Sequence, residues 1–179
     1  SARARQLAQQ ITEDAGPYAL ALKAIAEKRF DDARRLLDKA QEQKEIALAE
    51  IYRTRGQTEL YAGNYIGAAE WYEKALALAP NNMEIVRQAG LVFFYNARHE
   101  DAEPLLRRAL EADEGYFGPN APIVARDLNS LAQLLQDTNR LEEAEPLMER
   151  AVEILEKSRG SSHPNVAVAL NNLAELLRV

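Results

Sequence analysis

The sequence predicts an all-α protein, a solenoid in which antiparallel pairs of helices stack one on another. The first observation behind this is an internal repeat: EDAEPLLRRALE at 100–111 returns almost unchanged as EEAEPLMERAVE at 142–153, 42 residues further on. The repetition continues in GPNAPIVARDLNSLAQLLQ at 118–136 and GSSHPNVAVALNNLAELLR at 160–178, which share 10 of 19 residues. Repeated units of about 20–50 residues are typical of solenoids.

The second observation is that each unit carries two amphipathic helical patterns with a turn between them. The period reaches back in steps of 34 residues from Ala102 to Ala68 and of 35 from Ala68 to Ala33. Around the turn at Gly63-Asn64, the second helix repeats apolar residues at helical spacing: Ala68, Trp71, Tyr72, Ala75 and Leu76. Small residues recur where helices must cross closely: Gly56, Gly90, Ala132 and Ala174 in first helices, and Ala33, Ala68, Ala102 and Ala144 in second helices.

The predicted elements follow in order along the chain. A helix near 2–14 is a cap or the remnant of an earlier unit, and four helix pairs follow at 17–44, 46–80, 82–114 and 122–158. A single helix at 164–178 closes the array with part of its apolar face unpaired, so we expect the chain to belong to a longer protein.

Four prolines fit this division into elements. Pro104 and Pro146 fall within about the first two turns of second helices, where few backbone N–H groups have an acceptor to lose. Pro122 and Pro164 suit the first turn of first helices. We therefore assign these prolines to helix starts and not to chemistry.

Composition excludes several classes of protein. The 179 residues carry a net charge of −6 without a clustered basic surface, which argues against nucleic acid as a partner. No apolar run approaches the ~18 residues that cross a bilayer, so we expect no membrane insertion. The absence of cysteine removes disulfides and thiolate metal sites, and it fits a cytoplasmic protein without excluding the periplasm.

No residue pattern indicates catalysis. His99 and His163 lie in turns without a nucleophile or carboxylate at a useful spacing, and we expect turn or capping roles for them. Trp71 falls on the apolar side of its helix, and we expect it in the core. No phosphate loop and no metal-ligand motif is present. We predict no enzyme, no cofactor and no metal.

The repeats resemble a known family. The stretch AEIYRTRGQTELYAGNYIGAAEWYEKALALAPNN at 49–82 is similar to a tetratricopeptide repeat, with its aromatic, small and proline positions at Tyr52, Gly56, Ala68, Tyr72, Ala75 and Pro80. The 42-residue units resemble the kinesin-light-chain-like variety found in many bacterial proteins, whose Gly-x-x-His-Pro loop matches GSSHP at 160–164. At 118–122 the loop reads GPNAP, with Ala121 in place of histidine.

The resemblance implies a right-handed solenoid with defined repeats. It is weakest in the first repeat, where Pro17 and Ala21 stand at the aromatic and glycine positions. The implied domain is a single solenoid over 1–179, divided into an N-terminal helix at 1–14, repeats at 15–48, 49–82, 83–124 and 125–166, and the first helix of a truncated repeat at 167–179.

The resemblance also implies a concave wall formed by the first helices, whose side chains bind a peptide or partner segment. Carried over by repeat position, the candidate binding residues are Tyr18, Arg53, Gln57, Tyr61, Arg87, Leu91, Phe94, Tyr95, Arg126, Asn129, Gln133 and Asn171. Arginines, amides and aromatic residues in this set favour an extended or helical peptide with an acidic residue near an apolar or aromatic anchor.

Alternatives to this interpretation stay open. Arg53 and Arg87 can instead pair with Glu50 and Glu84 at i, i+3 and only solubilise the wall. The chain can also act as a self-assembly or spacer segment of a longer solenoid, associating through its terminal helices. Chaperone-tail-binding members of the family place lysine and asparagine where this chain has Tyr18 and Leu22, so we expect no carboxylate clamp of that design.

Overall fold

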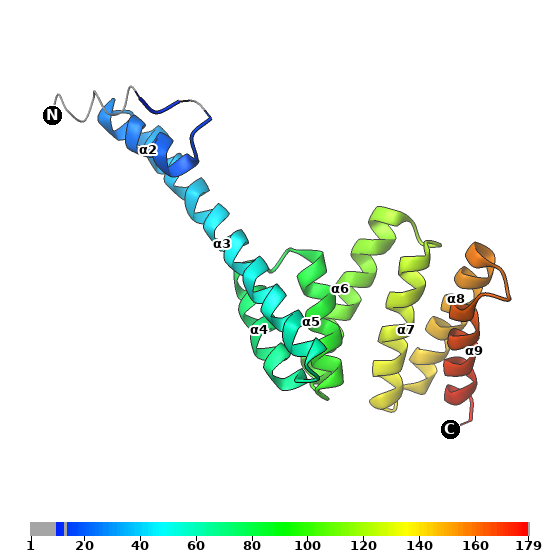
Figure 1. The fold of residues 1–179 in the computed structure, drawn as a ribbon. Helices are drawn as coiled ribbons and strands as arrows, with labels where there is room; N and C mark the ends of the chain where they lie inside the picture. The colour runs from blue at the N-terminus through cyan, green and yellow to red at the C-terminus, as the bar shows by residue number, and fades with distance from the viewer. Residues whose placement is uncertain (1–9, 13, 179) are drawn as a thin grey trace. The chain divides into compact units, whose positions relative to one another are not determined.

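The structure of the protein, a computed structural model, describes residues 10–12 and 14–178. The helix predicted near 2–14 lies largely outside these residues. The chain forms two compact units, Ser1–Ile51 and Tyr52–Val179. The regular elements of the described part are helices, which confirms the predicted fold class. Their bounds are α2 Pro17–Ala26, α3 Phe30–Tyr61, α4 Tyr65–Leu78, α5 Met83–Tyr95, α6 His99–Phe117, α7 Pro122–Asp137, α8 Leu141–Arg159 and α9 Pro164–Leu176 (Figure 1).

The helix α3 differs from the prediction. A break was expected between residues 44 and 46, and this was wrong, because α3 is continuous over 32 residues. The segment LDKAQEQKEIALAE at 37–50 contains no glycine or proline and is rich in alanine, glutamine, glutamate and lysine, which are strong helix formers. Local propensity therefore carries the helix through the expected turn, and the repeat boundary proposed at 48/49 falls inside one helix.

The first unit contains α2 and most of α3. Pro17 begins α2 with its fixed φ and missing N–H, in the first turn where no acceptor is lost. Ala21, Ala24 and Ala33 are buried. The ammonium of Lys23 donates a 2.9 Å hydrogen bond to the carbonyl oxygen of Ile11, which fixes the segment before α2 to the helix.

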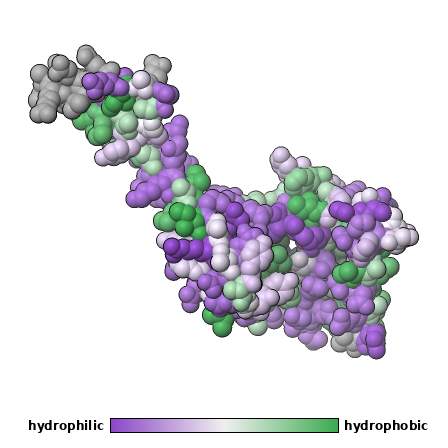
Figure 2. Space-filling view, in the orientation of Figure 1, coloured by the Kyte–Doolittle hydropathy of each residue, from purple (hydrophilic) through white to green (hydrophobic). Residues whose placement is uncertain are grey.

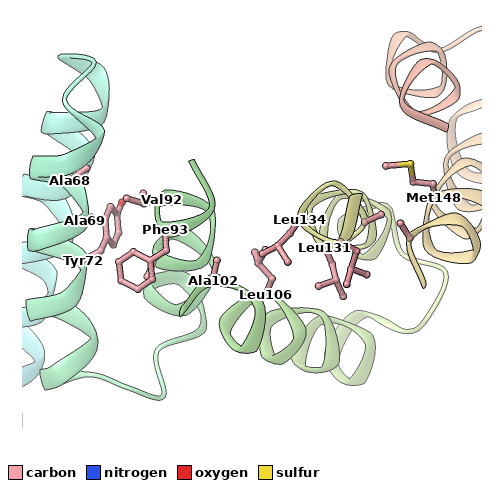
Figure 3. Packing of buried hydrophobic residues seen from close by; sticks show 14 of the residues in the cluster. Ala68, Ala69, Tyr72, Val92, Phe93, Ala102, Leu106, Leu131, Leu134 and Met148 are labelled. Atoms are coloured by element: carbon pink, nitrogen blue, oxygen red, sulfur yellow. The ribbon is translucent and has the colours of Figure 1, made fainter. Parts of the chain in front are cut away.

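The second unit is an α-solenoid in which consecutive helices pack on one another, α4 on α5, α5 on α6 and so on to α9. Buried side chains from the facing helices interlock: Tyr72 of α4, Val92 and Phe93 of α5, Leu106 of α6 and Leu134 of α7 belong to one cluster (Figure 3). A second cluster, which includes Leu128, Ile154 and Val166, joins α7, α8 and α9. Most of the surface visible in Figure 2 is hydrophilic, with small apolar patches.

Small residues stand at the helix crossings, as predicted. A Cβ added to Gly56 would lie 2.7 Å from the ring of Tyr72, and one added to Gly90 would lie 3.0 Å from Leu106. Ala68, Ala102, Ala132 and Ala144 are fully buried. Ala174 is exposed instead, on the last helix. A larger side chain at Gly56 or Gly90 would push its helix away from the next one.

The helix ends also follow the sequence. Pro122 and Pro164 stand in the first turns of α7 and α9, and Pro104 and Pro146 lie within the first two turns of α6 and α8. The Nδ1 atom of His163 accepts a 3.1 Å hydrogen bond from the N–H of Asn165, so this histidine caps α9. Gly118 and Gly160 end α6 and α8 with φ of 87° and 81°, a conformation that favours glycine.

One predicted core residue lies nearer the surface. Trp71 is half-buried, with the ring of Tyr52 at 5.5 Å between centroids. The ammonium of Lys74 lies 4.2 Å and the guanidinium carbon of Arg55 4.7 Å from the centre of its ring. The indole therefore covers the rim of the α3–α4 contact and holds two cations over its faces.

Candidate functional site

Six of the twelve predicted binding residues line one cavity of about 380 Å³ in the second unit. They are Gln57, Tyr61, Arg87, Leu91, Tyr95 and Arg126, and they come from α3, α5 and α7. We call this space the Arg87 cavity. Half of the residues carried over from the sequence by repeat position therefore line one cavity.

The aromatic side of the Arg87 cavity is open to solvent. Tyr61 is 84% exposed and Tyr95 62% exposed, whereas most large apolar side chains of α5 are buried. The ring of Tyr65 meets Tyr95 edge-on at 5.9 Å between centroids, and the amide of Gln57 donates a 3.2 Å hydrogen bond to the hydroxyl of Tyr61. These contacts hold the two amphipathic rings at the surface.

Arg87 itself is buried in a network of carboxylates. Its side chain is 11% exposed, and its Nη2 lies 2.6 Å from Asp113 of α6. Its Nη1 lies 2.9 Å from Glu84, and its Nε lies 3.6 Å from Asp127 of α7. The pairing with Glu84 that the sequence left open is therefore present, together with two acids, Asp113 and Asp127, that the sequence analysis did not name. The charge of Arg87 is neutralised within the protein.

The carboxyl of Asp127 is the member of this network whose ionised form is least favoured. Burial, and then the neighbouring carboxyl of Asp113, raise the pKa of Asp127 to about 6, although Arg126 and Arg87 act in the opposite direction. Among the described residues, Oδ2 of Asp127 and Nε of Arg87 have no hydrogen-bond partner. The guanidiniums of Arg87 and Arg126 therefore compensate the buried carboxyl of Asp127 only in part.

A polar chain joins the Arg87 cavity to the core of α4. The buried hydroxyl of Tyr72 donates a hydrogen bond to Gln88, whose amide in turn donates to Glu84 at 2.6 Å. Burial raises the pKa of Tyr72 to about 12. The hydroxyl therefore stays protonated and acts as a structural donor.

A second cavity of about 430 Å³ lies along α7 and α9, and we call it the Arg159 cavity. Arg126 and Asn129 of the predicted set line it, together with residues that the sequence analysis did not name: Ile123, Arg159, Asn165 and Val168. Arg126 borders both cavities. Asn129 accepts a 2.9 Å hydrogen bond from the amide of Asn172, which links α7 to α9.

Five predicted residues line neither of these two cavities. Phe94 is half-buried and packs on the core, with its ring 5.4 Å from that of Tyr95. Arg53 and Gln133 are half-buried, and Asn171 is exposed on α9. Tyr18 is exposed and belongs to α2 of the first unit.

The residues that the prediction missed leave a partial trace in the sequence. Asp127 falls between Val124 and Leu131 on the buried face of α7, and Asp113 follows Ala109 by one turn on that of α6. An acid on an apolar face indicates a buried partner. Arg159 ends a second helix, outside the first-helix positions that the family pattern assigns to the wall, so position alone could not select it.

The described residues contain no group of three or more His, Cys, Asp or Glu side chains that could hold a metal ion. A membrane span is likewise missing from the helices of that part of the chain, since none is long and apolar enough.

Sequence comparison assigns the architecture to a family. Tetratricopeptide repeat profiles match residues 49–82, 83–157 and 128–178. The chain belongs to the tetratricopeptide repeat family. A search of curated proteins finds no match.

Solved tetratricopeptide repeat structures have the same fold. BtubC (BKLC) from P. vanneervenii is 24% identical with a TM-score of 0.67, and the match covers 99% of this chain and 78% of that one. Kinesin light chain TPR-like repeats from Podospora anserina are 18% identical, with a TM-score of 0.65 and coverage of 90% and 84%. The first TPR of Spaghetti (RPAP3), bound to the HSP90 peptide SRMEEVD, is 20% identical, with a TM-score of 0.57 and coverage of 74% and 93%.

Proposed function

We propose that this tetratricopeptide repeat protein is a non-catalytic interaction module that binds a peptide or partner segment on the wall formed by α3, α5 and α7. The observation that carries the proposal is the convergence of six predicted positions on the Arg87 cavity. The peptide bound to the Spaghetti repeat, a protein of similar fold, supports the same use of the architecture.

The chemistry of the Arg87 cavity favours an apolar or aromatic anchor. Tyr61 and Tyr95 offer exposed ring faces beside Leu91, and buried aromatic contacts of this kind supply much of the binding energy in peptide recognition. The guanidinium of Arg126 is 54% exposed and adds a positive charge at the edge. An acidic residue beside the anchor would complement it.

The proposal is tested by peptide display on the wild-type chain and on the Tyr61→Ala/Tyr95→Ala double variant. We expect wild type to enrich peptides with aromatic or aliphatic anchors, and the variant to bind the enriched peptides at least ~10-fold more weakly. Both tyrosines are exposed, so the helicity and thermal midpoint of the variant should match those of wild type.

The matched control is Tyr116→Ala. Tyr116 is an 83% exposed tyrosine of α6 that lines neither of the two cavities. Equal loss of binding in this control and in the double variant would mean that the peptides bind exposed tyrosines nonspecifically and not at the proposed wall. Equal binding by wild type and the double variant would place the site elsewhere.

A second candidate function is self-association through α9. Val168 and Leu170 of α9 are 60% and 44% exposed, and Leu177, which caps its C-terminal end, is 61% exposed. Multi-angle light scattering between low and high micromolar concentration tests it. A mass that rises with concentration in wild type, and stays at one chain in Leu170→Glu/Leu177→Glu, would support assembly over peptide binding.

A further inference from the structure

The Arg159 cavity combines positive charge with apolar surface. Arg126 of α7 and Arg159 of α8 supply two guanidiniums, and Asn129 and Asn165 supply two amides. Ile123 and Val168 supply aliphatic surface. Among the described residues no acidic side chain lines it, although the whole chain carries a net charge of −6. The side chains that line this cavity are therefore positively charged, whereas the net charge of the whole chain is negative.

Both arginines keep donors available for a ligand. Arg126 contacts Oδ1 of Asp127 through Nε at 3.4 Å and Nη2 at 3.3 Å, and its Nη1 has no hydrogen bond within the described part of the chain. Nη1 of Arg159 lies 3.5 Å from Nε2 of His163. Arg159 forms no ion pair among residues 10–12 and 14–178. A carboxylate entering this space would thus meet guanidinium donors without displacing a short ion pair.

The size and lining of the cavity fit more than an ion. About 430 Å³ is within the ~300–1,000 Å³ of ordinary ligand pockets. Val168 is 60% exposed at one side, and Leu155 and Ala169 form a buried floor. Filling the space would cover this aliphatic surface, which a simple inorganic anion cannot do.

We propose that the Arg159 cavity binds a carboxylate of a partner peptide together with the aliphatic side chain next to it. The inference rests on the proposed peptide-binding function, and it adds a second subsite with its own chemistry. Arg126 borders both cavities, so one extended segment that passes Arg126 contacts Tyr61 and Tyr95 on one side and Arg159 on the other. The carboxylate is that of a Glu or Asp side chain, and a carboxylate at the end of the peptide chain is the alternative that the test distinguishes.

The test uses peptides enriched by display on wild type and then synthesised with a fluorescent label. Each is made as selected, with its acidic residue changed to the amide, and with its C-terminus amidated. Binding is measured by fluorescence anisotropy to wild type and to Arg126→Gln/Arg159→Gln. The matched control is Arg34→Gln/Arg35→Gln, which removes two exposed arginines that line neither of the two cavities.

We expect the selected peptides to carry Glu or Asp beside Val, Ile or Leu. The Arg126→Gln/Arg159→Gln variant should bind them about 10-fold more weakly, whereas the control should bind within about 2-fold of wild type. The amide form of the peptide should bind wild type and variant equally. Loss on amidation of the C-terminus, in place of the side chain, would assign the carboxylate to the chain end.

Other outcomes overturn the inference. Selected peptides without an acidic preference, or equal losses in the variant and the control, would show that the arginines do not form a subsite. If binding then still depends on Tyr61 and Tyr95, the proposed function stands and only the subsite fails. If no peptide is enriched on wild type, both fail.

Discussion

The Arg87 cavity and the Arg159 cavity lie in the same helical unit and share Arg126, yet they use arginine in opposite ways. Arg87 is surrounded by Glu84, Asp113 and Asp127 and is 11% exposed. In the described part of the chain no acid lines the Arg159 cavity, where Arg126 reaches Asp127 at 3.3 Å from a half-exposed position and Arg159 has no ion pair. A repeat position therefore determines where a side chain lies. The acidic side chains on neighbouring helices determine whether its guanidinium is paired within the protein or can bind a ligand.

The strongest test of this difference compares Arg87→Ala with Arg126→Ala. Removing Arg87 leaves the buried carboxyl of Asp113 without its ion-pair partner and Asp127 with Arg126 alone, and we expect the free energy of unfolding to fall by about 3 kcal/mol. Arg126 also reaches Asp127, at 3.3 Å, but its guanidinium is 54% exposed, so its removal should lower the free energy of unfolding by less than about 1 kcal/mol. Urea denaturation followed by circular dichroism at pH 7.5 measures both. Equal effects would mean that the buried network contributes nothing special to stability.

The second prediction concerns the acid pair beside Arg87. The pKa of Asp127 is raised to about 6 in the folded protein, against an ordinary value of 3.8. Between these values the folded state holds the proton more tightly than the unfolded state. Protonated Asp127 therefore makes its full contribution to the free energy of unfolding below about pH 4, and this contribution is lost as the pH rises through 6.

Asp127→Asn should remove this dependence. Relative to wild type, we expect the unfolding free energy of the variant to increase by about 2 kcal/mol between pH 4.5 and 7.5. Urea midpoints at three pH values measure it, and Asp137→Asn, at the exposed end of the same helix, is the control. A difference between Asp127→Asn and wild type that does not change with pH would contradict the raised pKa of Asp127, which burial causes first and Asp113 second.

The sequence predicted the architecture well because each repeat has to meet the same local structural requirements. Small residues at crossings such as Gly56 and Gly90, and prolines at the starts of α7 and α9, are local requirements that recur at each period. The break near residue 45 failed for the opposite reason, since no local signal there opposes a helix and the expected turn depended on analogy between repeats alone.

The candidate site was predictable only in part. Repeat positions selected six residues that converge on the Arg87 cavity, but burial of Arg87 depends on Asp113 and Asp127, which lie 26 and 40 residues further along the chain. Arg159 joins the second cavity from the end of α8, outside the positions of the pattern. The burial of Arg87 and the position of Arg159 both depend on contacts between different helices. The repeat period of the sequence does not reveal such contacts.

The prediction with the smallest expected effect concerns the contact between α7 and α9 beside the Arg159 cavity. The wall of the Arg87 cavity is fixed by ion pairs, whereas α7 and α9 are linked beside the Arg159 cavity by the amide hydrogen bond from Asn172 to Asn129. We expect Asn172→Ala to lower the free energy of unfolding by about 0.5–1 kcal/mol, because a partly buried neutral hydrogen bond contributes about this much.

The neighbouring Asn171→Ala is the matched control, since Asn171 is exposed and occupies the repeat position that the sequence assigned to binding. It should change stability by less than about 0.3 kcal/mol. The two variants differ by one residue along α9, so urea midpoints compare the two positions directly. If Asn171→Ala were the more destabilising, the amide bridge would not set the α7–α9 contact, and the shape of the Arg159 cavity would have to come from the apolar cluster of Leu128, Ile154 and Val166 alone.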